Sequence, residues 1–576
     1  MKKFVKCTAM LLVAAMMLGM ASCSKETEET KKKKKKTKKT TESSETTDEP
    51  TEDPTEDPTY DPTTDPTDEP TDTSGAPTDT TKAPTGTAGA NGLLIDVPEE
   101  GCAISMPTDE RFFYTMDLTL DTDAHTIGGH VDFEFFNTSD EDWDQLCFRD
   151  YPSLFIENKN VGAKSNVTLN GALTEIKNIT DGRDQSTIEY TRDDDVSVVW
   201  VPLQTKLAPG EKMTLSYDFV ATIPTIADRF GVKDDVYNVT NFYPILAVYT
   251  EDGWSHEAYY NMGECFFSEL SDYDVTLTVP EDFMVLSTGV TVSENVKGVN
   301  KTCKLDGTCV RDFVFSCSPN FKLIEGDYEG VHINVVYDEA HPASSSMDDC
   351  QAACLKAAQD SLASLGSALG KYPYPEVDIV LAPIDAGGME YPNLVIITVD
   401  SLYCSTNSYQ TIPYQLISGV IAHELGHQWF MGIVGSNSGL EPWLDESFAS
   451  YTEIIYFSYM GADEEITYYS RDVLDLTDKT IVQALLAMDA VPINRPHYTF
   501  SNDDSYVTAA YYVGEMALYQ MEEILGTEAF RGVLREYVRR NAFTNSTEAR
   551  FFETLYDCVG TDNEDLNNLI AGVFQR

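Results

Sequence analysis

The period of the hydrophobic pattern changes once along this chain, and that change limits the fold more than any other feature. From about residue 93 to residue 321, apolar and polar residues alternate, as in HVDFEFFN (130–137), DYDVTLTVP (272–280) and RDFVFSCS (311–318). Alternation with a period of two is typical of half-buried β-strands. Turn residues separate these runs at strand-like intervals, so we expect an N-terminal antiparallel β domain over residues 93–328.

Helical spacing replaces the alternation in the second half of the chain. Residues 348–369 are rich in Ala and Leu at helical intervals, and EVDIVLAPI (376–384) has the pattern of a buried strand. Further helical patterns cover residues 446–459, 506–524 and 546–558. The sequence therefore predicts an α+β domain over residues 329–576 and an α+β multidomain fold for the chain.

The first 22 residues have the pattern of a secretory signal. Three lysines precede a short apolar run that is too short to span a bilayer, and small residues then lead to Cys23. This sequence resembles a bacterial lipobox, which implies cleavage before Cys23 and its lipidation. We therefore expect a lipoprotein anchored to the membrane at the bacterial cell surface, facing outwards. A plain signal peptide cut nearby, with Cys23 incidental, is the alternative.

Residues 23–92 contain almost nothing apolar. A lysine run is followed by repeats such as TEDPTEDPTYDPTTDPTDEP, and this composition cannot form a core. Proline and charge repulsion favour an extended chain. We interpret the segment as a disordered tether between the anchor and the folded part.

The formal net charge of −55 excludes one class of partner. Nucleic acid phosphates would be repelled, so we expect no nucleic acid partner. Most of the negative charge lies beyond residue 92, where it favours solubility outside the cell and disfavours acidic substrates.

The segment GVIAHELGHQWF (419–430) contains the first candidate functional residues. In a helix, His423 and His427 lie on one face, close enough for both imidazoles to bind one metal ion. Glu424 would project towards a water on that metal. The flanking residues are mostly apolar, so the helix should be buried, and buried histidines need partners. Two surface histidines, the alternative, would have polar neighbours.

A carboxylate 19 residues after His427 completes the set. Glu446 lies in WLDESFA (443–449), at the start of an apolar helical pattern. Two histidines and one glutamate leave the fourth position of Zn²⁺ open for water, as catalysis requires, and we expect one zinc ion per chain. The alternative is an ordinary acid near a helix N-terminus, a role that Asp445 would also fill.

The spacing of these motifs resembles that of the aminopeptidase N family of zinc metallopeptidases, the gluzincins. GGMEYPN (387–393) is similar to that family's G-x-M-E-N motif, with Tyr391 in place of Asn. YYVGEMAL (511–518) is similar to its Tyr-x-Lys-Gly segment, with Val513 in place of Lys. The strand-rich sequences 272–289 and 311–322 resemble its N-terminal domain. The resemblance implies a thermolysin-like α+β catalytic domain.

The resemblance also implies roles for individual residues. Glu424 would be the general base that activates a zinc-bound water, and Tyr511 would stabilise the oxyanion, with Tyr512 as the competitor. Glu390 would bind the free α-ammonium of a peptide. The substrate backbone would lie along Gly387, Gly388 and Met389, and Glu453 would support a zinc histidine. Gln428 and Trp429 have the character of residues that pack or that support a metal ligand, rather than of catalysts.

These implications predict a zinc aminopeptidase that removes N-terminal residues from extracellular peptides. A zinc endopeptidase of the same fold, or an inactive surface binding lipoprotein, are the alternatives. The chain ends 130 residues after Glu446, so we expect it to lack the helical C-terminal domain of full-length relatives. The sequence does not determine the oligomeric state, the disulfide pairing or the preferred N-terminal residue.

Overall fold

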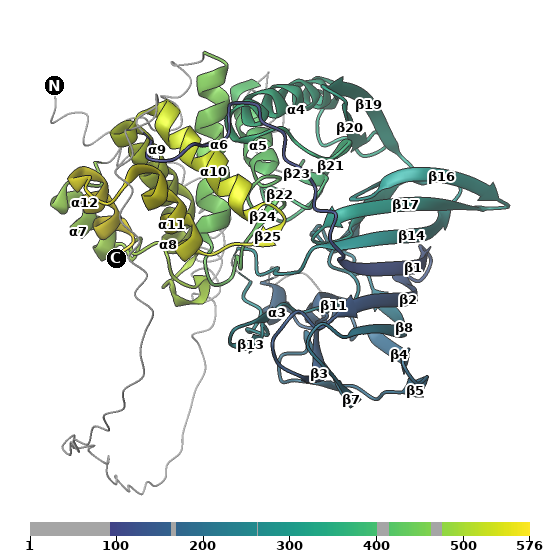
Figure 1. Ribbon diagram of the computed structural model, residues 1–576. Helices are drawn as coiled ribbons and strands as arrows, with labels where there is room; N and C mark the ends of the chain where they lie inside the picture. Colours follow the sequence, from purple (N-terminus) through teal and green to yellow (C-terminus); the bar gives the residue numbers. More distant parts are fainter. Residues whose placement is uncertain (1–92, 163–168, 262, 400–413, 462–474, 576) are drawn as a thin grey trace, which may run out of the picture. The chain divides into compact units, whose positions relative to one another are not determined.

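The computed structural model describes residues 93–162, 169–261, 263–399, 414–461 and 475–575 (Figure 1). Cys23, the predicted signal 1–22 and the predicted tether 23–92 lie outside these residues. The described residues belong to one compact unit, Ala88–Arg576. None of their helices is both long enough and apolar enough to cross a bilayer.

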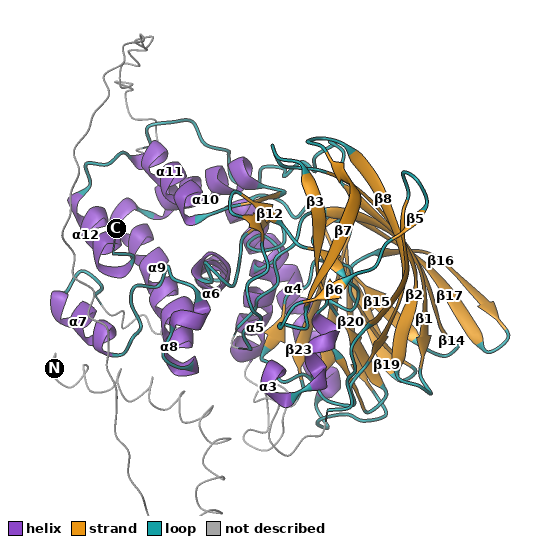
Figure 2. Ribbon diagram, turned by 90° about the horizontal axis from the view of Figure 1, so that it is seen from below, coloured by secondary structure: helices purple, strands orange, loops and turns teal. Residues whose placement is uncertain are grey.

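A sheet of eight strands dominates the N-terminal region (Figures 1 and 2). Its order is β16-β17-β14-β1-β2-β8-β4-β5. The β1–β14 ladder is parallel, whereas the other neighbours are antiparallel. Alternate residues of β1, including Tyr114, Met116 and Leu118, point into the core. The strands are β1 (Phe112–Asp121), β2 (Thr126–Phe136), β4 (Glu175–Asp181), β5 (Ser186–Thr187), β8 (Lys212–Thr222), β14 (Ser271–Pro280), β16 (Val290–Lys297) and β17 (Asn300–Val310).

Smaller sheets complete this region. One has the order β15-β18-β10-β9, another has the order β11-β3-β7-β6, and β12 pairs with β13. Their strands are β3 (Trp143–Arg149), β6 (Thr191–Arg192), β7 (Val198–Leu207), β9 (Gly231–Lys233), β10 (Val236–Val239), β11 (Ile245–Leu246), β12 (Tyr249–Thr250), β13 (Gly253–Trp254), β15 (Met284–Ser287) and β18 (Phe315–Ser318). A 3₁₀ turn, η1 (Tyr151–Ile156), and a short helix, α3 (Asn158–Val161), follow β3.

A five-stranded sheet begins the C-terminal region. Its order is β19-β20-β21-β23-β22, and the long helix α4 (Met347–Leu369) connects β20 to β21. The strands are β19 (Phe321–Tyr328), β20 (Val331–Asp338), β21 (Glu376–Ala382), β22 (Gly388–Met389) and β23 (Leu394–Thr398). The strand β22 forms the edge and runs antiparallel to β23, so the GGMEYPN segment lies at the rim of the sheet.

Helices make up the rest of the C-terminal region and lie on one side of the β-sheets (Figure 2). They are α5 (Tyr414–Gly426), α6 (Trp443–Tyr459), α7 (Lys479–Ala487), α8 (Asp503–Val507), α9 (Gly514–Leu525), α10 (Thr527–Asn541), α11 (Glu548–Val559) and α12 (Glu564–Val573). A 3₁₀ turn η2 (His497–Thr499), a π-helical segment η3 (Thr508–Val513) and the paired strands β24 (Val434–Gly435) and β25 (Thr544–Asn545) join them.

The predicted α+β multidomain fold is confirmed, with β-rich and helical regions in the expected order. The strands of the N-terminal sheets end at Ser318. The next strand, β19, lies before the predicted boundary at residue 328, yet it pairs with β20 in the sheet of the C-terminal region. Because both strands of this hairpin alternate in hydrophobicity, the sequence pattern alone does not show which sheet they join.

A buried arginine connects the two regions. Arg311 follows β17, and its guanidinium donates to the carbonyl oxygens of Gly432 (3.0 Å), Ser268 (3.1 Å) and Thr544 (2.8 Å). Gly432 lies in the turn after the histidine helix, and Thr544 begins β25. The bonds to Gly432 and Thr544, with a further one to the Asn545 side chain, therefore hold the end of the candidate site against the β region, whereas Ser268 lies in the β region itself.

We expect Arg311→Met to lower the free energy of unfolding by about 3 kcal/mol, because three backbone carbonyls lose a charged donor. Chemical denaturation followed by circular dichroism would measure the change. Lys371→Met, which removes an exposed ion pair with Glu329, should change it by less than about 1 kcal/mol. Equal stability of the two variants would contradict a connecting role for Arg311.

Candidate metal centre

Two buried helices bring the predicted ligands together. His423 lies on α5, and His427 continues its turn through a bond from its backbone N–H to the His423 carbonyl (3.2 Å). Glu446 lies in the first turn of α6, which packs against α5. The Thr452 hydroxyl on α6 donates to the Ala422 carbonyl on α5 (3.0 Å). A Cβ at Gly426 would lie 2.1 Å from that hydroxyl oxygen, so glycine permits this close approach.

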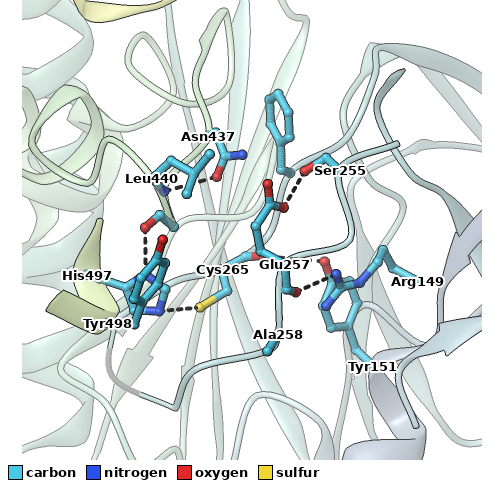
Figure 3. A pocket seen from close by; sticks show the side chains of 12 residues that line it. Arg149, Tyr151, Ser255, Glu257, Ala258, Cys265, Asn437, Leu440, His497 and Tyr498 are labelled. Atoms are coloured by element: carbon cyan, nitrogen blue, oxygen red, sulfur yellow. Dashed lines mark hydrogen bonds between the residues drawn. The ribbon is translucent and has the colours of Figure 1, made fainter. Parts of the chain in front are cut away.

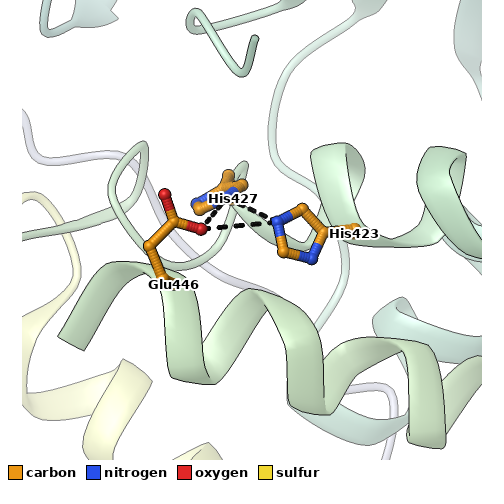
Figure 4. Close-up of side chains that lie close together, drawn as sticks. All are labelled: His423, His427 and Glu446. Atoms are coloured by element: carbon orange, nitrogen blue, oxygen red, sulfur yellow. Dashed lines mark hydrogen bonds and ion pairs between the residues drawn. The ribbon is translucent and has the colours of Figure 1, made fainter. Parts of the chain in front are cut away.

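The three ligand atoms form a nearly equilateral triangle (Figure 4). The Nε2 atoms of His423 and His427 lie 3.3 Å apart. Glu446 Oε2 lies 3.4 Å from the first and 3.5 Å from the second, and it has no hydrogen-bond partner. The centre of such a triangle is about 2.0 Å from each atom, which is the distance that Zn²⁺ keeps from imidazole nitrogen and carboxylate oxygen. The residues present therefore fit a zinc ion.

The remote nitrogen of each histidine faces a carboxylate. His423 Nδ1 bonds to Glu453 Oε1 (3.1 Å). His427 Nδ1 lies 2.6 Å from Asp445 Oδ1, at an ion-pair distance although not at the angle a hydrogen bond prefers. The second Asp445 oxygen accepts from the Ser438 hydroxyl (2.7 Å). A neutral imidazole in such a place keeps its proton on Nδ1, which leaves Nε2 free as a ligand.

A second group of ligand-type atoms lies beside the first. Atoms of Glu390, His427 and Asp445 also lie within 4.8 Å of one another. Asp445 already faces Nδ1 of His427, whereas the first group uses the Nε2 atoms of both histidines. His423, His427 and Glu446 are therefore the better candidate metal ligands, and Glu390 is a separate carboxylate at the edge of that group.

Buried carboxylates surround the triangle. Burial raises the pKa of Glu424 to about 7, and it also raises the pKa values of Glu390 and Glu264. The negative charge of Glu264 further raises the pKa of Glu390, and Glu390 Oε1 has no hydrogen-bond partner. Burial lowers the pKa of His423, but the facing carboxylates of Glu446 and Glu453 overcome this effect and raise the pKa to about 10. The centre thus attracts positive charge.

The GGMEYPN segment lies against Glu424. A Cβ at Gly388 would lie 2.0 Å from Glu424 Oε1, so only glycine fits there. A Cβ at Gly387 would meet no atom within 4 Å, which leaves open space beside the backbone. Met389 is fully buried, and its sulfur lies 3.5 Å from an Arg229 nitrogen. Glu390 follows β22 and is 4% exposed.

Tyr511 lies on the π-helical segment η3. Its ring stacks on the His423 imidazole, with centroids 6.0 Å apart and 8° between the planes, and its hydroxyl interacts with Glu446. Burial raises the pKa of Tyr511 well above its usual value, so the phenol stays protonated. Tyr512 instead interacts with Glu453 and Glu515. The Ser447 hydroxyl, next to Glu446, donates to the Ala510 carbonyl (2.6 Å) and so fixes the π-helical turn.

A small cavity of about 20 Å³ lies between the β region and the helices (Figure 3). Its lining includes Arg149, Cys265 and His497. The Cys265 sulfur lies 3.1 Å from His497 Nε2. His497 Nδ1 in turn bonds to the Gly439 carbonyl (2.6 Å). The volume suits about one water molecule. None of the three metal-triangle residues lines it.

The structure thus brings together Glu390, His423, Glu424, His427, Glu446, Glu453 and Tyr511, all singled out from the sequence. Sequence reasoning missed Glu264, whose carboxylate bonds to Arg229 (3.0 Å) and interacts with Glu446 and Asp445. It also assigned Asp445 only to the helix terminus. No motif marks Glu264, because it comes from an irregular stretch before β14.

Comparison with known proteins identifies the C-terminal region. Residues 354–572 match the peptidase family M1 domain. Aminopeptidase Ey of Gallus gallus is 30% identical over 217 residues, and aminopeptidase N of Homo sapiens is 29% identical over 215. Each alignment covers 36% of this chain and 21% of the relative, so the chain spans about a fifth of the length of these relatives.

The fold extends further than the detectable sequence similarity. The crystal structure of an M1 zinc metallopeptidase from Deinococcus radiodurans superposes with a TM-score of 0.52 at 16% identity. The match covers 82% of this chain and 96% of that one, so it includes the β region. Residues 354–572 therefore form a peptidase family M1 domain, which is similar in sequence to part of aminopeptidase N.

Proposed function

We propose that this protein is a zinc-dependent aminopeptidase that removes N-terminal residues from peptides. The observation that carries the proposal is the pairing of a zinc-sized triangle, His423, His427 and Glu446, with an unpartnered buried carboxylate of Glu390 at its edge. One cation, the metal, suits the triangle. A second cation, the α-ammonium of a peptide, suits the edge.

Zinc held by the triangle would supply Lewis acidity, which activates water and polarises the scissile carbonyl. Glu424 is placed to accept the proton of the attacking water and to deliver it to the leaving amine. Its pKa of about 7, raised by burial, suits a group that must both take up and release a proton near neutral pH. Gly388 gives this carboxylate the room it needs.

Tyr511 is the donor that we assign to the developing oxyanion. Its protonated hydroxyl faces Glu446 beside the triangle, and its ring is held against His423. Tyr512 points to the Glu453 side, behind the histidine. The geometry therefore favours Tyr511 over its neighbour.

Glu390 and Glu264 together form the proposed site for the substrate's free amine. Glu390 is buried, Glu264 is largely buried, and both have raised pKa values. Because Glu264 is paired with Arg229, a bound ammonium would compensate the charge of Glu390 and would fix the scissile bond one residue from the peptide's end. An M1 zinc metallopeptidase of this fold has been crystallised with the substrate Tyr-Ser-Ala, which is consistent with a peptide here.

The retained Glu390 argues against the endopeptidase alternative, which needs no amine site. The complete set of His423, Glu424, His427 and Glu446 argues against an inactive binding protein.

We further propose that the enzyme is lipid-anchored through Cys23 on the outer side of a bacterial membrane, where it would act on extracellular peptides. Cys23→Ser should then release it from the membrane fraction.

We expect Glu424→Gln to retain one zinc ion per chain and to lower kcat on an aminoacyl anilide by about 10²- to 10⁴-fold, because the proton acceptor is lost. Metal analysis and steady-state kinetics would measure both. Glu376→Gln, which changes a carboxylate on β21, serves as the control and should leave kcat unchanged.

N-acetylated substrates should resist the wild-type enzyme. Equal cleavage of blocked and free substrates would rule out the aminopeptidase, and absence of zinc would rule out the whole proposal.

Asp445→Asn should weaken zinc binding by about 10- to 100-fold, because the acid that orients His427 is replaced by a neutral amide. Competition with a chromophoric chelator would measure the affinity. Asp378→Asn is the matched control: it is also a buried aspartate, it lies on β21 away from the triangle, and it should leave zinc affinity unchanged. Unaltered affinity in Asp445→Asn would contradict the orienting role.

Tyr511→Phe should lower kcat by about 10²- to 10³-fold with little change in KM, since the hydroxyl acts on the transition state. Tyr512→Phe removes a hydroxyl one residue away and should change kcat by less than about threefold. The reverse ranking of the two variants would reassign the oxyanion donor to Tyr512.

A further inference from the structure

A single buried glutamine joins the metal helix to the segment that carries Glu390. Gln428 directly follows His427 and is 1% exposed. Its Nε2 donates to the carbonyl oxygens of Tyr391 (3.1 Å) and Glu390 (3.4 Å). Its Oε1 accepts from the Asn393 backbone N–H (2.9 Å). Both ends of the carboxamide are therefore committed to one short stretch of backbone.

Other hydrogen bonds hold that stretch in a defined shape by joining it to parts of the fold other than the metal helix. Asn393 has a φ of 60°, and its side chain bonds to the Tyr372 hydroxyl (2.6 Å) and the Thr288 carbonyl (3.1 Å). The Tyr391 hydroxyl donates to Thr240 Oγ1 (2.8 Å), on the β region. Gln428 differs from the residues that make these contacts, because it directly follows His427, a candidate metal ligand.

The distance between two functional groups depends on this connection. His427 belongs to the metal triangle, and Glu390 is the proposed partner of the substrate amine. A peptide anchored at its amine presents its first bond to the metal only if the two groups keep one fixed separation. Displacement of a positioned group by about 1 Å is enough to lower a rate by about 100-fold.

We propose that Gln428 is a positioning residue that sets the separation between Glu390 and the metal, and thereby restricts cleavage to the first peptide bond. This inference rests on the proposed aminopeptidase function. The competing interpretation is a glutamine that only contributes hydrogen bonds to stability. The two interpretations differ in what they predict for substrates with and without a free amine.

The chain contains a matched control. Gln351 on α4 is also 1% exposed, and its Nε2 donates to two backbone carbonyls, Lys322 (2.7 Å) and Val335 (2.6 Å). It joins a helix to strands, as Gln428 does, but its partners lie in β19 and β20 rather than beside the metal. Gln351→Met therefore reproduces the loss of stability without the loss of positioning.

The experiment compares Gln428→Met and Gln351→Met in the zinc-loaded enzyme. Each variant is assayed on a free aminoacyl anilide, on its N-acetylated form, and on an unblocked tripeptide whose products are separated by mass. We expect Gln428→Met to retain zinc and to lower kcat/KM on the free anilide by about 10- to 100-fold. Residual cleavage of the acetylated anilide should be unchanged, and a dipeptide should appear among the N-terminal products of the tripeptide. Gln351→Met should keep the wild-type ratio between cleavage of the free anilide and cleavage of the acetylated anilide. It should also give the wild-type products from the tripeptide.

A second variant keeps the test decisive if Gln428→Met does not fold. Gln428→Glu retains the acceptor for Asn393 and loses the donor to Glu390 and Tyr391, so the free-to-blocked ratio should again narrow. In a Glu390→Gln background, neither substitution at position 428 should narrow the free-to-blocked ratio further, because the carboxylate that Gln428 positions is already lost. An unchanged ratio in folded, zinc-loaded variants, or loss of zinc itself, would overturn the inference. A wild-type enzyme without discrimination would instead refute the proposed function.

Discussion

The packing of α5 against α6 determines where the metal ligands lie. The histidines come from one helix and the carboxylate from the other, and Gly426 lets the Thr452 hydroxyl reach the α5 backbone. Because both helices are buried, the side chains between them cannot be satisfied by water. Each histidine instead uses a carboxylate behind it, Glu453 or Asp445, and the Nε2 atoms converge on Glu446. Loss of this packing would separate the ligands and leave buried charges unpaired.

The presentation of Tyr511 depends on the same pair of helices. The residue after Glu446, Ser447, bonds to the carbonyl before Tyr511, and a Cβ at Gly514 would lie 1.8 Å from the Ser447 hydroxyl oxygen. The absence of a side chain at Gly514 therefore leaves the space that the Ser447 hydroxyl occupies. A π-helical turn leaves a carbonyl without its usual α-helical partner, and such turns occur often at functional sites. The metal ligand and the phenol are thus fixed through adjacent residues of α6.

Local sequence patterns predicted the parts of this site that depend on local structure. The spacing of His423 and His427 is a property of one helix, and the apolar residues around them indicated burial. Glu446 followed from a second helical pattern at a suitable distance. The sequence pattern predicts only a packing or supporting role for Gln428, because its three hydrogen-bond partners lie 35 to 38 residues earlier in the chain. Glu264 was missed because only the tertiary fold brings the stretch before β14 to α5 and α6. The pairing of β19 with β20 was ambiguous for a related reason, since alternation identifies a strand but not its sheet.

The balance of charge explains why one site suits two different cations. Glu264, Glu390, Glu424, Asp445 and Glu446 surround two imidazoles, and Arg229 is already paired with Glu264. A zinc ion would compensate the carboxylates nearest the histidines, and Arg229 compensates Glu264, but Glu390 keeps an oxygen without a hydrogen-bond partner. Burial favours the protonated form of Glu390, whereas an ammonium bound beside it would favour the carboxylate. A peptide with a blocked amine offers no such charge, and its neutral amide would meet the same carboxylates without compensation. In the proposed aminopeptidase, selectivity for a free N-terminus would follow from this excess of acid, and the proposed link through Gln428 would convert that selectivity into a fixed position of the cleaved bond.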